Sequence, residues 1–299
     1  SMRRQLLKSS FATLNRRKQI MAFSFLKQFE KDAGSTLVID ALNLAFRWKH
    51  NGKTDFVQEY IATVQSLAAS YNCEKIIITA DQGSSSYRKN LDPGYKQNRK
   101  DKYAEQTEEE AAAFKLFFQE YEKTLAALEN MYPVLRYDGV EADDIAAHLV
   151  KFKGHYGLDT IWLVSSDRDW DLLISDTVSR FSYVTRKEVT KANWSDHYDV
   201  SMEEYISLKC LTGDKGDNVP GIPGVGPKRA QGLIEQFGDA MSVYDAVPLS
   251  GSYKYIQNVN LHAEQILKNY ELMDLITYCD DAIGVDNIND IEEKLLVED

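Results

Sequence analysis

Apolar side chains gather in short runs that alternate with longer amphipathic stretches between residues 34 and 167. The runs at 36–40, 75–81 and 160–167 are almost continuously apolar, which is typical of strands buried on both faces. Helical spacing predicts helices at 56–70, 108–131 and 141–152. A further short strand is predicted at 133–138. Strands that alternate with helices predict an α/β fold, with a mostly parallel central sheet and helices on both of its faces.

The pattern changes near residue 195. Beyond it the apolar runs fade, and short helical stretches alternate with Gly and Pro turns. We therefore predict three segments: a basic extension at 1–33, an α/β core at 34–195 and a helical region at 196–299.

Composition limits the class of protein. With 299 residues, 43% of them hydrophobic and 27% charged, the chain has the balance of a globular protein with an ample core. No apolar run approaches the roughly 18 residues that a membrane span requires, so we expect no membrane partner. The three cysteines lie far apart and the five histidines show no ligand spacing. These features argue against a disulfide framework and a zinc site.

Charge is unevenly distributed along the chain. The net charge is −11, but residues 1–29 carry seven basic side chains and no acidic one, which leaves 28 basic and 46 acidic side chains elsewhere. Such a stretch is typical of an organelle transit peptide, and equally of a basic helix that packs on the domain or contacts phosphates. We favour the helix, because Phe23, Phe25 and Phe29 supply apolar surface for packing.

Carboxylates follow the strongest predicted strands. Asp40, Asp81 and Asp167 each end one of them, and in a parallel sheet these ends share the edge at which ligands bind. Further acids begin helix 141–152, follow Asp167 and lie in the Gly-rich stretch GDKGDN: Glu141, Asp143, Asp144, Asp169, Asp214 and Asp217. Taken singly, Asp143 or Asp144 is explained as a helix cap, and Asp171 as a solvated turn residue.

The nine carboxylates are harder to explain as a set. In one crevice they repel one another unless cations neutralise them. Ligand sets made of oxygen suit hard divalent ions such as Mg²⁺ or Mn²⁺. Two such ions about 4 Å apart suit the hydrolysis of phosphate esters.

A basic and aromatic stretch lies between strand 75–81 and the long helix. Residues 86–107 lack a clear apolar face and carry six basic against three acidic side chains, with tyrosines between them. Loops of this length are usually functional or disordered. The charge and the rings predict a surface that follows a nucleic-acid strand. A helix over 94–103 places Lys96 and Arg99 on one face.

A second stretch, GIPGVGPKRA at 221–230, predicts a tight hairpin before a helix. A proline suits the first helical position, and backbone N–H groups at a helix start bind phosphate. The combination is typical of duplex DNA contacts that do not depend on base sequence. The hairpin glycines and the basic residues that follow are Gly221, Gly224, Gly226, Lys228 and Arg229.

Together these stretches resemble the 5′ nuclease family of flap endonucleases and 5′→3′ exonucleases, and most of all its stand-alone phage-encoded members. The shared motifs run in order from about residue 35 to beyond 270: VIDALN, TADQGSSSYR, YKQNR, GVEADD, SSDRDWD, GDKGDN and GIPGVGPKRA. The resemblance implies a PIN-like or resolvase-like core and a structure-specific nuclease. Such an enzyme hydrolyses DNA phosphodiesters near single-strand/double-strand junctions in replication by a two-metal-ion mechanism.

The resemblance also implies roles for individual residues. The first metal ion is expected at Asp40, Asp81, Glu141, Asp143 and Asp144, and the second at Asp167, Asp169, Asp214 and Asp217. Lys96 and Arg99 are expected to contact the cleaved phosphate from a helical arch at about 86–130, with Tyr95 stacking beside them. The helix–hairpin–helix element is expected at 213–238, where the family implies a potassium ion at the hairpin.

Two other functions stay open. A PIN-like ribonuclease shares the carboxylates at the strand ends but does not usually need the arch and the hairpin. A non-catalytic, structure-specific DNA-binding protein tends to lose metal ligands, whereas all nine matched positions here are acidic. We expect a monomer that acts on DNA with a 5′ flap in the cytoplasm of a phage-infected bacterium.

Overall fold

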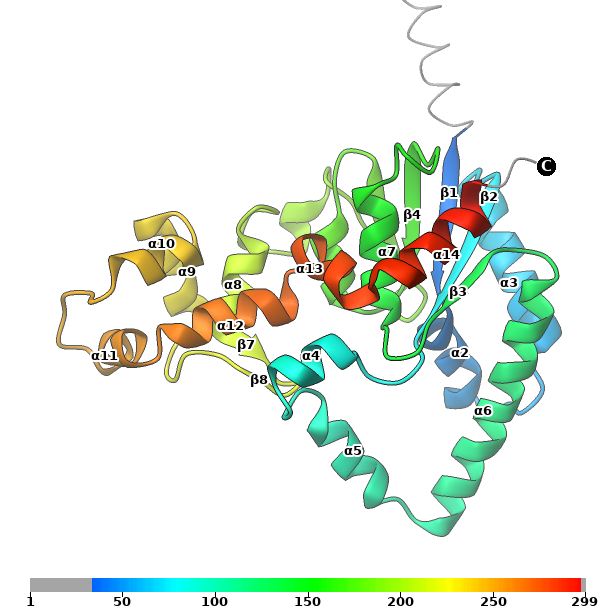
Figure 1. The fold of residues 1–299 in the computed structure, drawn as a ribbon, viewed down its shortest axis with the longest axis horizontal. Coiled ribbons are helices and arrows are strands. Elements are labelled where there is room, and N and C mark those ends of the chain that lie inside the picture. The colour runs from blue at the N-terminus through cyan, green and yellow to red at the C-terminus, as the bar shows by residue number, and fades with distance from the viewer. Residues whose placement is uncertain (1–33, 297–299) are drawn as a thin grey trace, which may run out of the picture.

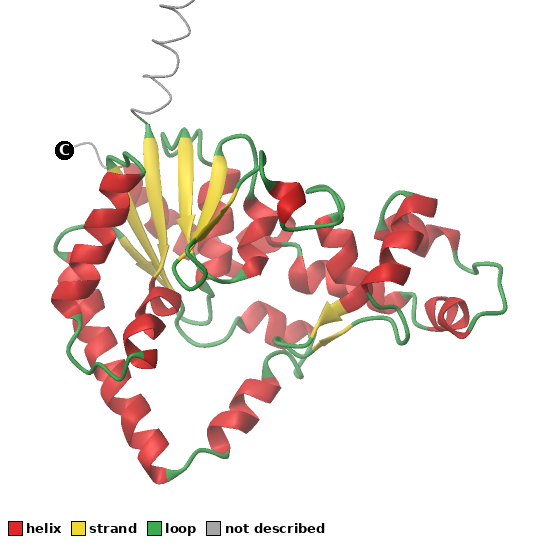
Figure 2. Cartoon of the chain, turned by 180° about the vertical axis from the view of Figure 1, so that it is seen from behind, coloured by secondary structure: helices red, strands yellow, loops and turns green. Residues whose placement is uncertain are grey.

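A six-stranded sheet forms the centre of the computed structural model, which describes residues 34–296 (Figure 1). Expectations about residues 1–33 concern chain outside the described residues. The strand order is β3-β2-β1-β4-β5-β6, and every neighbouring pair is parallel except β5 with β6. This confirms the mostly parallel sheet, which Figure 2 shows from behind. The strands are β1 Ser35–Asp40, β2 Lys75–Ala80, β3 Val134–Arg136, β4 Thr160–Val164, β5 Val178–Ser182 and β6 Lys187–Val189.

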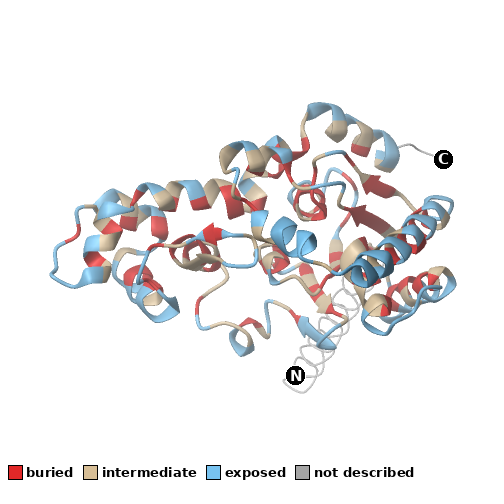
Figure 3. Cartoon of the chain, turned by 90° about the horizontal axis from the view of Figure 1, so that it is seen from below, coloured by how far each residue is buried: buried red, intermediate tan, exposed pale blue. Residues whose placement is uncertain are grey.

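Helices cover both faces of the sheet, because consecutive residues of the central strands point to opposite sides. Val38 and Leu163 belong to one apolar core, with α7, α13 and α14. Leu37 and Ile39 belong to the other, with α2, α3 and α6. Figure 3 shows the strands largely buried between them. The covering helices are α2 Ala41–His50, α3 Val57–Ser70, α6 Glu108–Glu129, α7 Ala142–Lys151, α13 Leu275–Ile283 and α14 Val285–Leu296.

A smaller helical part extends from one side of the sheet and has its own apolar core, which includes Leu211, Ile234 and Val259 (Figure 1). The chain then returns: α13 packs against α7, and α14 packs against α13 and contributes Ile291 to the same apolar core on one face of the sheet. The last two helices of the region 196–299, which was predicted as a separate helical segment, therefore belong to the α/β part. The elements of the helical part are α8 Tyr205–Thr212, β7 Gly213–Asp214, β8 Val219–Pro220, α9 Pro227–Phe237, α10 Ala240–Ala246, α11 Lys254–Leu261 and α12 Glu264–Met273.

An arch made of three helices stands beside the carboxyl ends of the strands (Figure 1). The helices are α4 Ser86–Leu91, α5 Gln97–Ala104 and the long α6, so the loop predicted at 86–107 is mostly helical. The side chain of Thr107 accepts from the Glu110 N–H, and the Glu110 side chain accepts in return from the Thr107 N–H. This capping box starts α6 at the tip of the arch.

The apolar pattern did not predict every element. It missed α2, β5 and β6, and the two short turns η1 Arg168–Leu173 and η2 Trp194–Asp196. Among the described residues, no helix is both long and apolar enough to cross a bilayer.

Candidate active site

The first carboxylate group, Asp40, Asp81, Asp143 and Asp167, lies at the carboxyl ends of three adjacent strands. Asp40 ends β1, Asp81 directly follows β2, and Asp167 lies three residues beyond β4. Asp143 joins them from the first turn of α7. Three hydrogen bonds orient this group: Ser165 Oγ donates to Asp40 Oδ2 at 2.7 Å, the Ala142 N–H to Asp81 Oδ1 at 2.6 Å, and Trp170 Nε1 to Asp143 Oδ1 at 2.6 Å.

Burial and mutual repulsion raise the pKa values of this group. Burial is the larger cause of the strongly raised pKa of Asp40, followed by the charge of Asp81. The pKa of Asp143 is strongly raised by burial and then by the charge of Asp167. Burial and the charge of Asp169 raise the pKa of Asp167 to about 6. The four carboxylates therefore repel one another, and a cation among them favours their ionised forms.

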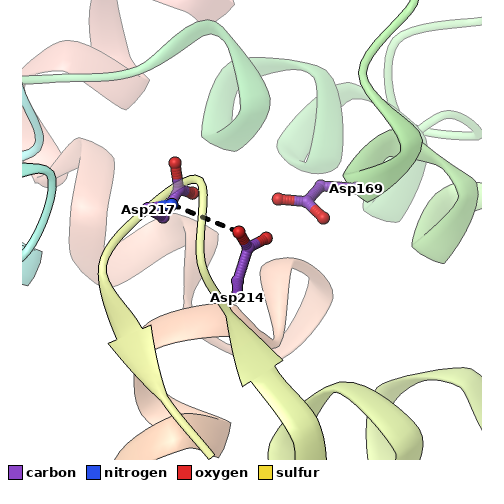
Figure 4. A group of neighbouring side chains, drawn as sticks. All are labelled: Asp169, Asp214 and Asp217. Atoms are coloured by element: carbon purple, nitrogen blue, oxygen red, sulfur yellow. Dashed lines mark hydrogen bonds between the residues drawn. The ribbon is translucent and has the colours of Figure 1, made fainter. Parts of the chain in front are cut away.

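The second carboxylate group consists of Asp169, Asp214 and Asp217, which each offer an oxygen within 4.8 Å of the others. Figure 4 shows the three side chains close together; Asp169 comes from η1, and the other two from β7 and the turn after it. Lys209 Nζ lies 2.5 Å from Asp169 Oδ1 and 3.3 Å from Asp214 Oδ2. An ammonium group of the chain itself therefore neutralises part of this group.

Glu141 and Asp144 are hydrogen-bonded to basic side chains of the chain itself. Glu141 accepts from Lys96 Nζ at 2.7 Å and from the Tyr95 hydroxyl at 2.7 Å. Burial raises the pKa of Glu141, but the charges of Lys96 and Arg88 outweigh it and lower the pKa. Both oxygens of Asp144 accept from the Arg88 guanidinium, at 2.6 and 2.7 Å, and Asp144 is fully buried. This ion pair argues against the predicted role of Asp144 as a metal ligand. That role stays a prediction.

The base of the arch contacts Glu141 and the second carboxylate group. Lys96 is the N-cap of α5 and has a left-handed φ of +54°, and its ammonium pairs with Glu141. Arg99 Nη2 pairs with Asp217 Oδ1 at 2.7 Å. The structure thus places both basic residues beside carboxylates, although α5 starts later than the helix predicted at 94–103.

Tyr95 is a buried neighbour of Lys96 and Glu141. Its ring is 3% exposed and lies in an apolar cluster with Leu272, while its hydroxyl donates to Glu141. The Lys96 ammonium lies 5.2 Å from the centroid of this ring, and the expected role of Tyr95 in DNA binding stays a prediction. Its apolar packing against α12 was not visible in the sequence.

Asp171 also corrects an expectation, since it is buried rather than solvated. Arg180 Nε donates to Asp171 Oδ1 at 2.5 Å and Arg180 Nη2 donates to Oδ2 at 2.9 Å, and the Tyr198 hydroxyl donates to the same carboxylate. Arg180 Nη1 also donates to the Ser165 carbonyl at 2.9 Å. This network fixes the η1 turn that carries the metal-ligand candidates Asp167 and Asp169. The sequence analysis missed it; its one signal was a single basic residue in the short stretch VSRFS at 178–182.

The hairpin at 221–226 precedes α9, as predicted. A Cβ on Gly221 would lie 2.3 Å from the Thr212 carbonyl carbon, and Gly224 has a φ of +80°, so both positions favour glycine. Gly226 is the N-cap of α9, and Lys228 and Arg229 are exposed on its first turn.

A cavity of about 740 Å³ lies under the arch beside the first carboxylate group. Asp81 and Glu141 line it, together with five basic side chains. The basic residues are Lys89, Lys96, Arg99, Lys100 and Arg136. This arrangement offers anionic ligands for hard cations next to positive charge for an anionic substrate.

Comparison with known proteins identifies relatives along almost the whole described chain. The model of the 5′-3′ exonuclease N-terminal resolvase-like domain matches residues 35–199, and that of the 5′-3′ exonuclease C-terminal SAM fold matches residues 200–293. The flap endonuclease of Escherichia phage T5 is 43% identical over 265 residues, which cover 87% of this chain and 91% of that protein. A 5′-3′ exonuclease of Buchnera aphidicola is 29% identical over 219 residues, which cover 73% of this chain and 72% of that protein.

Solved structures of the phage T5 protein have the same fold. A pseudo-enzyme-product complex of the T5 D15 flap endonuclease with DNA and metal ions is 42% identical, with a TM-score of 0.84, covering 88% of this chain and 98% of that one. The T5 5′-exonuclease with bound zinc ions matches with the same identity, TM-score and coverage.

Proposed function

The chain belongs to the 5′-3′ exonuclease family, and we propose that its two carboxylate groups hold two divalent metal ions that hydrolyse DNA phosphodiesters. It is a metal-dependent nuclease of the flap endonuclease and 5′-3′ exonuclease type. Its substrate is DNA with a 5′ flap, cut near the single-strand/double-strand junction during replication. The observation that carries the proposal is the meeting of buried carboxylates with a basic cavity at the ends of the parallel strands.

The donor chemistry fits hard ions. The first ion is assigned to the first carboxylate group and the second ion to the second group, and every donor is a carboxylate oxygen. This donor set suits Mg²⁺ or Mn²⁺.

Three residues are assigned differently from the expected ligand sets. Asp144 is left out because Arg88 uses both of its oxygens. Glu141 is left out because Lys96 uses both of its oxygens. Asp167 is moved from the second ion to the first, because its charge acts on Asp143 and Asp40.

The residues of the chain position the substrate for attack. When bound, the ions supply an activated water and stabilise the charge on the attacking and leaving oxygens. Lys96 and Arg99 line the same cavity as Asp81, so their charges face a phosphate bound there and stabilise the transition state. Lys96 stays charged: burial lowers its pKa, but the charges of Glu141, Asp217 and other neighbours together raise this pKa well above its ordinary value.

The hairpin is assigned to the duplex beside the junction. Its free backbone N–H groups at the start of α9, with Lys228 and Arg229, suit a phosphate. A potassium ion at the hairpin, which the resemblance implies, stays part of the proposal, because two of the hairpin carbonyl oxygens each accept only one hydrogen bond and keep a second lone pair. Gly224 O accepts from Arg229 Nη1 and Pro223 O from Asn258 Nδ2, each at 2.8 Å.

One chain carries the carboxylates, the arch and the hairpin, which supports a monomeric enzyme. The 43% identity to a phage T5 protein supports a place of action in the cytoplasm of a phage-infected bacterium.

The test is cleavage of a 5′-flap DNA substrate in Mg²⁺ and in excess chelator. We expect cleavage only with Mg²⁺, and we expect Lys96→Met to lower kcat by about 10²–10³-fold while DNA affinity falls far less. Lys102→Met, which alters an exposed lysine on the same helix, is the matched control and leaves kcat unchanged.

Other results would contradict the proposal in distinct ways. DNA binding without cleavage in Mg²⁺ would indicate a non-catalytic binding protein. Preferential cleavage of an RNA flap would indicate a ribonuclease. Equal losses of cleavage and affinity in Lys96→Met would contradict the role given to the ammonium.

A further inference from the structure

The hydroxyl group of Tyr121 on α6 has no hydrogen-bond partner, although the residue is only 2% exposed. Among the buried side chains of residues 34–296, one other polar atom shares this property, Thr36 Oγ1. A buried hydroxyl without a partner costs about 1–3 kcal/mol, so such groups are rare in folded proteins. A donor that is unpaired in the free protein suggests a partner that arrives with a ligand.

The position of Tyr121 fits such a ligand. It lines the cavity under the arch, which Asp81 and Lys96 also line. Its ring packs on Phe117, with centroids 6.5 Å apart and planes 11° apart, and its edge meets Phe118 at 6.4 Å. These contacts hold the ring in one place, so the hydroxyl is preorganised.

Charge defines what the hydroxyl can bind. Burial raises the pKa of Tyr121, and the charge of Asp81 raises it further. The group is therefore a neutral donor near neutral pH. The cavity carries more basic than acidic side chains, and this balance favours an anionic acceptor.

We propose that the Tyr121 hydroxyl donates a hydrogen bond to a non-bridging phosphate oxygen of the DNA strand that occupies the cavity. The inference rests on the proposed function and adds a phosphate contact from α6 to those of Lys96 and Arg99 on the opposite side of the arch. The contact forms only in the complex, so its free energy contributes to binding and not to the stability of the free protein.

The first measurement compares Tyr121→Phe with the wild type on a 5′-flap DNA in Mg²⁺. The variant keeps the ring and removes one oxygen, so its melting temperature stays equal to that of the wild type or rises. Its kcat/KM falls by about tenfold, the size expected for one hydrogen bond to a charged acceptor. Thr36→Val is the matched control, because it removes the other unpaired buried hydroxyl, at the opposite end of the strand that Asp40 ends. Its kcat/KM stays unchanged.

The second measurement locates the acceptor. Single phosphates near the cleavage point are replaced, one at a time, by neutral methylphosphonates. At one position the replacement should lower the kcat/KM of the wild type by about tenfold. The same replacement should lower the kcat/KM of Tyr121→Phe only slightly, because this variant already lacks the contact.

Three outcomes would overturn the inference. In the first, Tyr121→Phe cleaves like the wild type. In the second, its kcat/KM falls no further than that of Thr36→Val. In the third, the loss of kcat/KM caused by Tyr121→Phe adds fully to the loss caused by every methylphosphonate. In each of these the wild type still cleaves, so the proposed function stands. A wild type that fails to cleave in Mg²⁺ refutes the proposed function, and this inference with it.

Discussion

Asp167→Asn is expected to stabilise the metal-free protein, and to do so increasingly as the pH rises. Burial and the charge of Asp169 raise the pKa of Asp167 in the folded chain to about 6, from an ordinary value of 3.8. Between these values the folded state holds a proton that the unfolded state has lost. The stability contributed by this group is therefore complete below about pH 4 and is lost as the pH rises through about 6.

The size of the effect follows from the shift. Each unit of pKa difference corresponds to about 1.4 kcal/mol, so a shift of about two units makes ionised Asp167 destabilising by about 3 kcal/mol at pH 8. Asparagine at this position cannot ionise and removes that cost. It also keeps an oxygen that can accept from the Asp169 N–H, which lies 2.9 Å from Asp167 Oδ1.

The assay is urea denaturation of the wild type and Asp167→Asn in excess chelator, from pH 4.5 to 8. Titrations common to both proteins cancel in the difference between their free energies of unfolding. This difference should be about 1 kcal/mol in favour of the variant at pH 4.5, where the unfolded chain has already lost most of the proton, and reach about 3 kcal/mol at pH 8. Saturating Mg²⁺ should shrink or reverse it, because ligand binding stabilises the protein that binds more tightly. A difference that stays constant with pH would refute the reasoning.

Two further variants test the groups that hold the carboxylates. Asp171→Asn leaves the Arg180 guanidinium buried without a counter-charge and should cost about 3 kcal/mol of unfolding free energy in urea. Asp176→Asn, at an exposed ion pair, is the control and should lower the unfolding free energy by less than about 1 kcal/mol. Equal losses of unfolding free energy in the two variants would contradict the argument. Lys209→Met removes a cation that lies 2.5 Å from Asp169, and should tighten Mn²⁺ binding by about tenfold in calorimetry. Weaker binding would show that the ammonium positions the ligands instead.

The apolar pattern predicted the central strands well, because they are buried on both faces and read as continuous runs. It failed for β5 and β6 near the edge of the sheet. β5 alternates buried and partly exposed residues and includes the buried Arg180, whose charge is compensated by a partner nine residues away. The return of α13 to the sheet was also not predictable, because an amphipathic helix does not specify which apolar surface it covers.

The acidic residues of the candidate site were predictable from the sequence, and its basic residues were less so. Strand ends in a parallel sheet meet at one edge, so the convergence of Asp40, Asp81 and Asp167 follows from topology alone. The ammonium of Lys209 and the guanidinium of Arg88 became visible only when distant segments were folded together. Each comes from a helix with no distinctive local spacing, and each neutralises carboxylates far away in the chain.

The pairing of these charges explains how a chain with 46 acidic and 35 basic side chains can act on DNA. In the metal-free protein Lys96 pairs with Glu141 and Arg99 with Asp217, so the basic residues of the arch are partly neutralised by the site itself. A dication at the second carboxylate group competes with Arg99 for Asp217, because both need the same carboxylate. On the proposed assignment, an ion at the second carboxylate group would therefore add positive charge and also free Arg99 for phosphate. Local charge at the cavity, and not the net charge of the chain, then determines whether a DNA strand can enter.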